Sequence, residues 1–139
     1  KVLVLSGVVV VTEDGQGRYR QEVRLGQPSL IADAPVSAGG EDAGPAPFDF
    51  LMAGLGACTS MTLRMYAERK EWPLTGISVS LSHDRIEVDG VLRERITRPI
   101  DLNGSLSEAQ RTRLLEIAGK CPVHRALSQP FMLDCQLAD

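Results

Sequence analysis

The stretch that decides the fold is GPAPFDFLMAGLGACTSMTLRMYAERKEW, which spans residues Gly44–Trp72. From Phe50 to Leu63 it carries no charged residue, and Cys58 lies in the middle of that run. Pro47 suits the first turn of a helix, whereas Pro73 stops one because the residue before a proline avoids helical angles. The stretch therefore predicts a long helix between these two prolines.

One face of this helix carries apolar and small residues at helical spacing. Its members are Leu51, Leu55, Cys58, Thr62 and Met65. Apolar residues also cover the remaining sides, so the helix needs more cover than the short strands of one chain supply. We therefore expect a long, buried central helix and a homodimer in which two such helices share a core.

Length and composition predict one soluble domain over residues 1–139, with 43% apolar and 24% charged residues. The formal net charge of -3 excludes an electrostatic signature for nucleic acid or an anionic membrane. The uncharged run is shorter than the ~18 residues that suggest a membrane span. Three cysteines are too few for a disulfide scaffold, so we expect a cytoplasmic protein with reduced thiols.

The segments before the helix predict strands and a loop. The valine-rich segment Val2–Thr12 favours a strand over a signal sequence, because it lacks a small-residue cleavage site. A turn at Asp14–Gly17 leads into the alternating segment Arg18–Leu25, and Ser29–Ala32 predicts a third short strand. The Gly- and Pro-rich segment Ala34–Ala46 predicts a loop.

After the helix, the segment Ile77–Val88 has the alternation of a half-buried strand, and Asp89-Gly90 predicts a hairpin turn. The return strand is expected to be irregular at Pro99, which lacks a backbone N–H. Its apolar face comprises Leu92, Ile96, Ile100 and Leu102.

A second helix is predicted from about Leu106 to Gly119, with a capping box from Ser105 to Glu108. Its buried candidates are Leu106, Leu114, Leu115 and Ala118. A short helical turn follows over Cys121–Leu127. The alternating residues Phe131, Leu133, Cys135 and Leu137 predict a closing strand, with Cys135 in the core. The predicted order is β-β-(β)-α-β-β-α-β, an α+β fold.

Two cysteines are candidates for chemistry. Cys58 has small neighbours that let a substrate approach its sulfur, and Thr59 and Ser60 could hydrogen-bond its thiolate. Cys121 precedes Pro122, so its sulfur is expected to cap a short helix, where free N–H groups favour the thiolate. His124 and Arg125 are expected to add positive charge. Simple packing of each thiol in the core stays an alternative.

Two other kinds of site fit the sequence less well. Cys121 and His124 have a C-x2-H spacing and could bind zinc together with Cys58 and either Cys135 or His83. No second pair of closely spaced ligands faces them, so we expect no metal and no cofactor. A serine hydrolase is disfavoured because no G-x-S-x-G motif surrounds Ser60.

The segments GPAPFDFLMAGLGACTSM and KCPVHRAL together resemble the OsmC/Ohr family, and the similar order of elements covers essentially the whole chain. The continuation LRMYAERKEWPL resembles an OsmC-like subgroup. This resemblance implies an intertwined homodimer, with two sheets around paired central helices, that reduces organic hydroperoxides. Cys58 would attack the peroxide, Cys121 would resolve the sulfenic acid as a disulfide, and a dithiol would reduce that disulfide.

The resemblance also implies an acid and an arginine that support the first cysteine. Asp49 is the matching acid, but nine residues of helix give ~13.5 Å of rise and the opposite face. It therefore reaches Cys58 through a kink or across the dimer, or else serves the helix N-terminus. Arg18 is the matching arginine, with Arg20 as an alternative, and a solvated strand face explains both equally well.

Two hypotheses compete with the peroxidase. A non-catalytic dimer could bind a small apolar ligand in the pocket around Cys58, which the nearby methionines Met52, Met61 and Met65 would suit. Alternatively, the thiols could be purely structural. A guanidinium in contact with Cys58 would favour the peroxidase over the binding protein.

Overall fold

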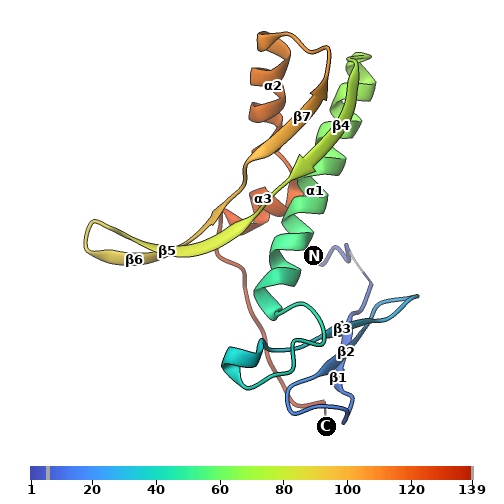
Figure 1. The fold of residues 1–139 in the computed structure, drawn as a ribbon, viewed down its shortest axis with the longest axis vertical. Coiled ribbons are helices and arrows are strands. Elements are labelled where there is room, and N and C mark those ends of the chain that lie inside the picture. The colour runs from blue at the N-terminus through green and yellow to red at the C-terminus, as the bar shows by residue number, and fades with distance from the viewer. Residues whose placement is uncertain (6, 139) are drawn as a thin grey trace. The chain divides into compact units, whose positions relative to one another are not determined.

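The computed structural model describes residues 1–5 and 7–138 of the chain. The chain forms two compact units, Lys1–Leu51 and Met52–Asp139, and each is described by itself. Strands and helices follow one another in an α+β order that begins with three short strands (Figure 1). The expectation of a single domain stays a prediction.

The first unit holds an antiparallel sheet in the order β1-β2-β3. Its strands are β1 (Val10–Glu13), β2 (Gln21–Arg24) and β3 (Leu30–Ala32). The third short strand is thus confirmed. The predicted strand Val2–Thr12 is wrong in its extent, because β2 pairs with only the four residues of β1. The described residues before β1 are exposed, and Ser6 lies outside the described residues.

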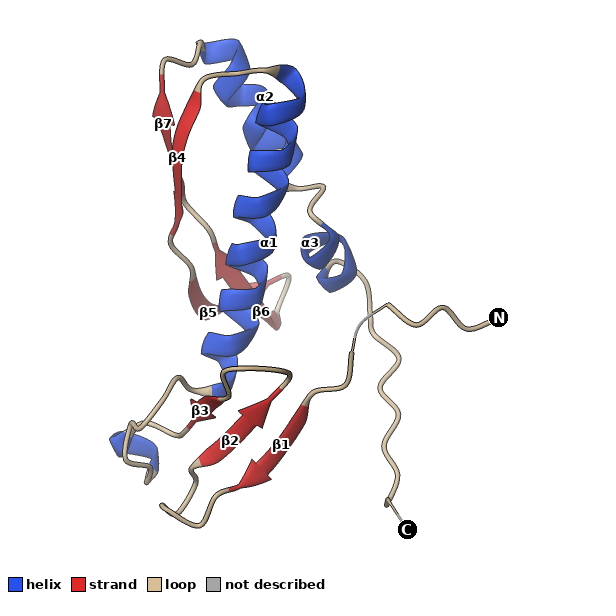
Figure 2. Cartoon of the chain, turned by 90° about the vertical axis from the view of Figure 1, so that its right-hand side faces the viewer, coloured by secondary structure: helices blue, strands red, loops and turns tan. Residues whose placement is uncertain are grey.

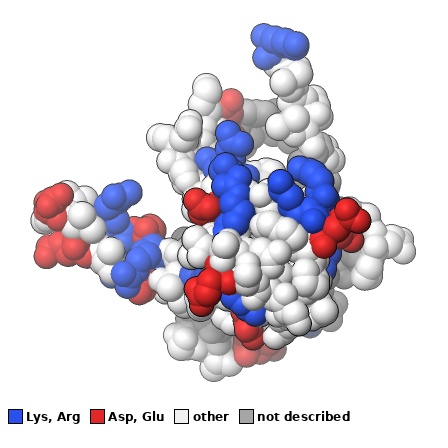
Figure 3. Space-filling view, turned by 90° about the horizontal axis from the view of Figure 1, so that it is seen from above, with Lys and Arg blue, Asp and Glu red and all other residues white. Residues whose placement is uncertain are grey.

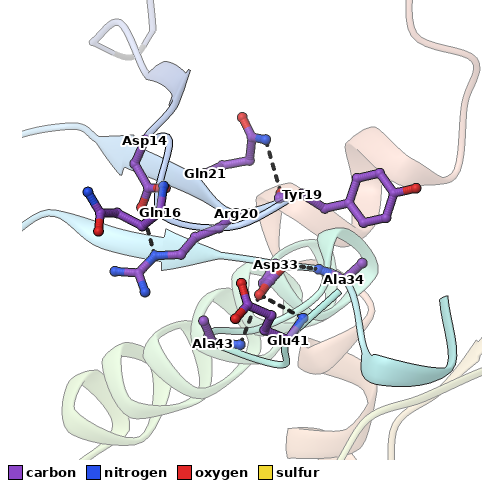
Figure 4. A network of polar contacts seen from close by, with 9 residues as sticks. All are labelled: Asp14, Gln16, Tyr19, Arg20, Gln21, Asp33, Ala34, Glu41 and Ala43. Carbon is purple, nitrogen blue, oxygen red and sulfur yellow. Dashed lines mark hydrogen bonds and ion pairs between the residues drawn. The ribbon is translucent and has the colours of Figure 1, made fainter. Parts of the chain in front are cut away.

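A buried carboxylate organises the loop after β3, which contains the 3-10 helix η1 (Val36–Ala38). Asp33 accepts backbone N–H bonds from Ala34 at 2.7 Å, Glu41 at 3.2 Å and Ala43 at 3.1 Å (Figure 4). These bonds span ten residues of an otherwise irregular segment. One side chain therefore satisfies three backbone donors and fixes the path of the chain before the long helix.

The long helix α1 (Pro47–Lys70) is confirmed, with Pro47 at its first position. It ends three residues before Pro73, because Glu71 takes the left-handed conformation with φ 57. The N–H of Trp72 then bonds the carbonyl oxygen of Ala67 at 2.9 Å, the arrangement that closes many helix C-termini.

The prediction of the buried face of α1 is wrong. The buried residues are Leu55, Gly56, Thr59, Leu63 and Ala67, whereas Met65 of the predicted face is 55% exposed. The cause lies in the packing: the second helix and the strands Leu74–Val79 and Ile100–Gly104 cover the side that carries Leu63 (Figure 2). The core of this unit consists of Leu63, Leu114, Ile117 and Ala118.

Two antiparallel ribbons follow α1. β4 (Leu74–Val79) pairs with β7 (Ile100–Gly104), and β5 (Ser82–Val88) pairs with β6 (Val91–Thr97). The hairpin at Asp89-Gly90 is confirmed, with φ 52 and 78. The irregularity at Pro99 is confirmed too, because Arg98 and Pro99 separate β6 from β7.

The β5–β6 ribbon carries charges of both signs that pair with each other across its strands (Figure 3). Arg95 contacts Asp84 at 2.7 Å, and Glu94 contacts Arg85 at 2.6 Å and His83 at 2.7 Å. Such exposed pairs contribute little to stability, because solvent screens the charges. The ribbon therefore has a mixed rather than a basic or an acidic surface.

Helix α2 (Glu108–Ala118) is confirmed, but the predicted capping box is wrong by two residues. Ser107 caps the helix with Gln110, because Leu106 still belongs to the turn after β7 and donates its N–H to the Gly104 carbonyl. Of the predicted buried residues, Leu115 is also wrong: it is 66% exposed.

The chain closes with the short helix α3 (Pro122–Leu127), as predicted. The predicted closing strand is wrong: residues 131–138 form neither strand nor helix, and Cys135 is exposed rather than in the core. A strand requires a paired backbone, and no described segment of the chain pairs with these residues. Among the described residues, no helix is both long and apolar enough to cross a membrane.

Asp33→Ala is expected to loosen the loop, because it removes the acceptor of three N–H groups. Those N–H bonds, first that from Ala43, hold the pKa of Asp33 below its ordinary 3.8. A lowered pKa in the folded state means that the stabilisation is present above pH 3.8 and is lost as the pH falls through the folded pKa. At neutral pH, the amide hydrogens of Ala34, Glu41 and Ala43 should therefore exchange faster in Asp33→Ala than in the wild type.

The matched control is Asp42→Asn, which removes a charge from the same loop at an exposed position with φ 56 that asparagine tolerates. It should leave the exchange of these amides unchanged. Equal exchange rates in wild type and Asp33→Ala would contradict the proposed role of the carboxylate.

Candidate active site

Cys58 lies in the middle of α1 and is half-buried. Beside it, Gly56 is buried under Leu81, the residue that precedes β5: a Cβ at Gly56 would lie 2.7 Å from Leu81 Cδ1. The absence of a side chain at Gly56 therefore lets the Leu81 side chain pack against α1. Its role as an opening for substrate stays a prediction.

Cys121 caps the N-terminus of α3, as predicted, and its side chain is completely buried. Its Sγ accepts the backbone N–H of His124 at 3.3 Å. The preceding N–H, that of Val123, points to Cys58 Sγ at 3.5 Å. Two consecutive donors of one helical turn thus hold the two sulfurs side by side, and both cysteines are free thiols.

Thr59, also completely buried, connects α1 to this turn. Its hydroxyl donates to the Leu55 carbonyl at 2.7 Å and lies 3.9 Å from Cys121 Sγ. The sequence-based prediction that Thr59 serves Cys58 is therefore wrong. Burial raises the pKa of Cys58, and a side-chain hydrogen bond from Thr62, one turn further along α1, offsets a part of this effect.

Arg98, in the segment between β6 and β7, makes two hydrogen bonds into the site. Its Nη1 donates to Thr59 Oγ1 at 2.9 Å, and its Nη2 lies 2.8 Å from His124 Nδ1. A guanidinium can only donate, so His124 Nδ1 must accept and the imidazole is the neutral Nε2–H form. Burial, followed by the charge of Arg98, lowers the pKa of His124. The site's positive charge therefore comes from Arg98, and the expected charge on His124 is wrong.

The two thiols differ in acidity. Burial raises the pKa of Cys58, and the nearby Cys121 raises it further. Burial also raises the pKa of Cys121, but the bonds from His124 N–H, Cys58 and Thr59, with the charge of Arg98, outweigh it and lower the pKa overall. The surroundings of the two sulfurs therefore favour a thiolate on Cys121 over one on Cys58.

The other predicted site residues take local roles in the first unit. The Asp49 carboxylate accepts the N–H of Ala46 at 2.9 Å and so caps the first turn of α1. The guanidinium carbon of Arg18 lies 5.0 Å from the ring centroid of Tyr19, a cation–π contact. Arg20 pairs with Asp14 at 2.7 Å. Catalytic roles for Asp49 and Arg18 stay predictions.

No group of three or more His, Cys, Asp or Glu side chains among the described residues is arranged to hold a metal ion. The residues that do gather, Cys58, Thr59, Arg98, Cys121 and His124, instead suit thiol chemistry. Sequence reasoning missed Arg98. The sequence does hold a sign of it: Arg98 is two residues from both Ile96 and Ile100, so it falls on the apolar face predicted for the return strand.

Comparisons with known proteins agree with this fold. The family model described as OsmC-like protein matches residues 39–135, which is more than half of the chain. No curated protein matches the sequence. Many solved structures share the fold of this chain, and three of them are described below.

The first is a protein from Psychrobacter arcticus 273-4 that is named for osmotic stress induction and detoxification response. It is 22% identical to this chain, with a TM-score of 0.71, and the match covers 89% of this chain and 91% of the Psychrobacter chain. An OsmC-like protein from Mycoplasma pneumoniae is 22% identical with a TM-score of 0.68, covering 87% and 84%. An organic hydroperoxide resistance protein from Legionella pneumophila is 20% identical with a TM-score of 0.67, covering 91% of both. These likenesses show the fold.

The His124 tautomer is directly testable by ¹⁵N NMR, because the sequence holds only two histidines. We expect His124 to be the neutral Nε2–H form at pH 7 and to titrate below its ordinary pKa of 6.5, since burial and Arg98 both disfavour the imidazolium. His83→Gln removes the other histidine signal and serves as the assignment control. A protonated Nδ1 at pH 7 would contradict the Arg98–His124 contact.

Proposed function

The chain belongs to the family of OsmC-like proteins, and from this premise we propose that it is a thiol-dependent peroxidase that reduces organic hydroperoxides to alcohols. The observation that carries the proposal is the pair of free sulfurs held by consecutive N–H groups of α3. Three of the similar structures carry the name organic hydroperoxide resistance protein, which favours this substrate class.

Cys58 is the attacking thiol in this proposal, because it is half-buried whereas Cys121 is fully buried. Its own pKa is raised, so it needs a base to remove its proton. The Cys121 thiolate beside it can accept that proton. Cys58 Sγ then attacks the distal peroxide oxygen, the O–O bond breaks, and the alkoxide takes up a proton to leave as the alcohol.

Cys121 resolves the resulting Cys58 sulfenic acid. Its sulfur attacks Cys58 Sγ, the S–O bond breaks, and water leaves with the Cys121 proton. The product is a Cys58–Cys121 disulfide, which a dithiol reduces. A reductant of this class fits the reducing conditions of the cytoplasm, where we propose that the protein acts and where free thiols persist.

Arg18 and Asp49 enter the proposal through the family resemblance alone. The resemblance gives Arg18 the role of holding the Cys58 thiolate and Asp49 that of pairing with the arginine. Arg18→Met and Asp49→Asn should then each slow peroxide consumption. Unchanged rates would leave Arg18 with its Tyr19 contact and Asp49 with its cap.

The main test is mass spectrometry of the intact protein after a stoichiometric dose of cumene hydroperoxide. We expect a loss of two hydrogens, a peptide link between Cys58 and Cys121, and reversal by dithiothreitol. Oxidised methionines with both thiols intact would contradict the peroxidase and favour a binding protein.

Three serine variants separate the roles. Cys58→Ser should abolish peroxide consumption, because the accessible nucleophile is gone. Cys121→Ser removes both the base and the resolving thiol, so it should consume peroxide more slowly and stop at a Cys58 sulfenic acid that dimedone traps. Cys135→Ser is the matched control, since Cys135 is exposed in the tail after α3, and it should behave as wild type.

We further propose that the protein is a homodimer. Met61 and Met65 on the outer side of α1 are 63% and 55% exposed. The tail after α3 exposes Phe131, Met132 and Leu133 by 60–89%. Apolar surfaces of this kind are typical of surfaces that bind another protein, and a second copy of the chain is the partner that the family resemblance favours.

Light scattering coupled to gel filtration should therefore give twice the chain mass. Met61→Lys combined with Met65→Lys is expected to shift the protein to the monomer, because it places two charges in the apolar surface. The control Glu87→Lys changes the net charge by the same two units at an exposed, already charged position of the β5–β6 ribbon, and it should leave the mass unchanged. A monomeric wild type would contradict the dimer.

A further inference from the structure

Arg98 brings a charge into the site that no acid neutralises. None of the ion pairs found among residues 1–5 and 7–138 includes it, although neighbouring Arg95 pairs with Asp84. Its guanidinium is half-buried and instead bonds a hydroxyl and a neutral imidazole. An unpaired, partly buried cation is costly unless an anion forms nearby. Cys121 can become that anion, because the charge of Arg98 acts on its thiol and favours the thiolate.

Thr59 connects the two. Its hydroxyl accepts from Arg98 and lies between the guanidinium and Cys121 Sγ. Accepting a charged donor polarises the hydroxyl and makes it a stronger donor in turn. The hydroxyl has a single hydrogen, which is directed at the Leu55 carbonyl oxygen 2.7 Å away. Rotation about the Cβ–Oγ1 bond can direct this hydrogen to a Cys121 thiolate instead.

His124 fixes the same sulfur from the other side. Its backbone N–H bonds Cys121 Sγ, and its ring accepts the second Arg98 hydrogen bond. Arg98 therefore hydrogen-bonds both residues that contact the Cys121 sulfur, Thr59 of α1 and His124 of α3. The titratable groups that face this sulfur are Cys58 from α1, Arg98 from the β6–β7 segment and His124 from α3.

We propose that Arg98, acting through Thr59 and His124, is a positioning residue that makes Cys121 the leaving sulfur when the Cys58–Cys121 disulfide is reduced, and so directs the incoming thiol to Cys58. The inference rests on the proposed function only in that it concerns the same disulfide. Accessibility points the same way, since Cys58 is half-buried and Cys121 is completely buried.

A thiolate of the dithiol attacks Cys58 Sγ, the S–S bond breaks, and Cys121 departs with the electron pair as a thiolate. The second thiol of the reductant then attacks the reductant sulfur in the mixed disulfide, and Cys58 departs and takes up a proton. The dithiol loses two electrons and becomes a disulfide. A thiol of lower pKa leaves faster, so a stabilised Cys121 thiolate speeds the first step.

The first experiment measures Cys121 alone, in a Cys58→Ser, Cys135→Ser background where it is the one remaining thiol of the three. Thiolate absorbance at 240 nm against pH should show a pKa higher by about one unit when Arg98→Met is added. Thr59→Val, which keeps the charge and removes the hydroxyl, should raise it as well. Arg95→Met is the matched control from the adjacent strand and should leave it unchanged.

The second experiment forms the disulfide with diamide, which needs no peroxidase activity, and follows its reduction by dithiothreitol with acid quench and mass spectrometry. Arg98→Met should slow the reduction by about threefold or more, in line with the dependence of exchange on thiol pKa. Arg98→Lys, which retains a charge, should rescue part of the rate. With the monothiol 2-mercaptoethanol, the trapped mixed disulfide should map to Cys58.

The outcomes separate this inference from the peroxidase. A mixed disulfide on Cys121, or equal pKa values and reduction rates in folded Arg98→Met and Arg95→Met, would overturn the role of Arg98 and leave the peroxidase standing. Failure of diamide to link Cys58 to Cys121 would also overturn it. A disulfide that forms with diamide but not with hydroperoxide, and that shows the Arg98 dependence, would sustain the inference and reject the peroxidase.

Discussion

The site depends on one buried hydroxyl, that of Thr59. It lies on the same face of α1 as Leu55 and Leu63, so the packing that places Leu63 in the core also turns Thr59 inward. A buried hydroxyl needs partners. Those partners come from three directions: the carbonyl of Leu55, the guanidinium of Arg98 and the sulfur of Cys121. The hydrophobic core and the chemistry of the site therefore share one helical face.

Local patterns predicted much of the fold from the sequence. Pro47 marked the first position of α1, Asp89-Gly90 gave the hairpin, and Cys121-Pro122 gave the capped turn, because each of these features depends on a few adjacent residues. The buried face of α1 and the closing strand were missed for the opposite reason. An all-round apolar helix does not reveal which side its partners cover, and a strand exists only where another backbone pairs with it.

Arg98 shows how a site residue escapes sequence reasoning. The family resemblance points to an arginine of the predicted second strand, Arg18 or its alternative Arg20. Yet Arg98 alternates with Ile96 and Ile100, and all three are half-buried. A charged residue in phase with apolar ones breaks the pattern of a half-buried strand, and such breaks are expected where function competes with packing. The sequence could have raised Arg98 as a candidate, but its partners on α1 and α3 are distant in sequence.

The two thiols differ in acidity because different donors and charges surround their sulfurs. Both sulfurs receive one N–H from α3, but only Cys121 also faces Thr59 and the charge of Arg98. Cys58 keeps access to solvent and pairs its thiol with the Cys121 sulfur, so access and acidity reside on different residues. This separation suits a redox pair. An accessible thiolate would meet any oxidant, whereas an accessible thiol beside a buried thiolate ionises when its proton passes to its neighbour.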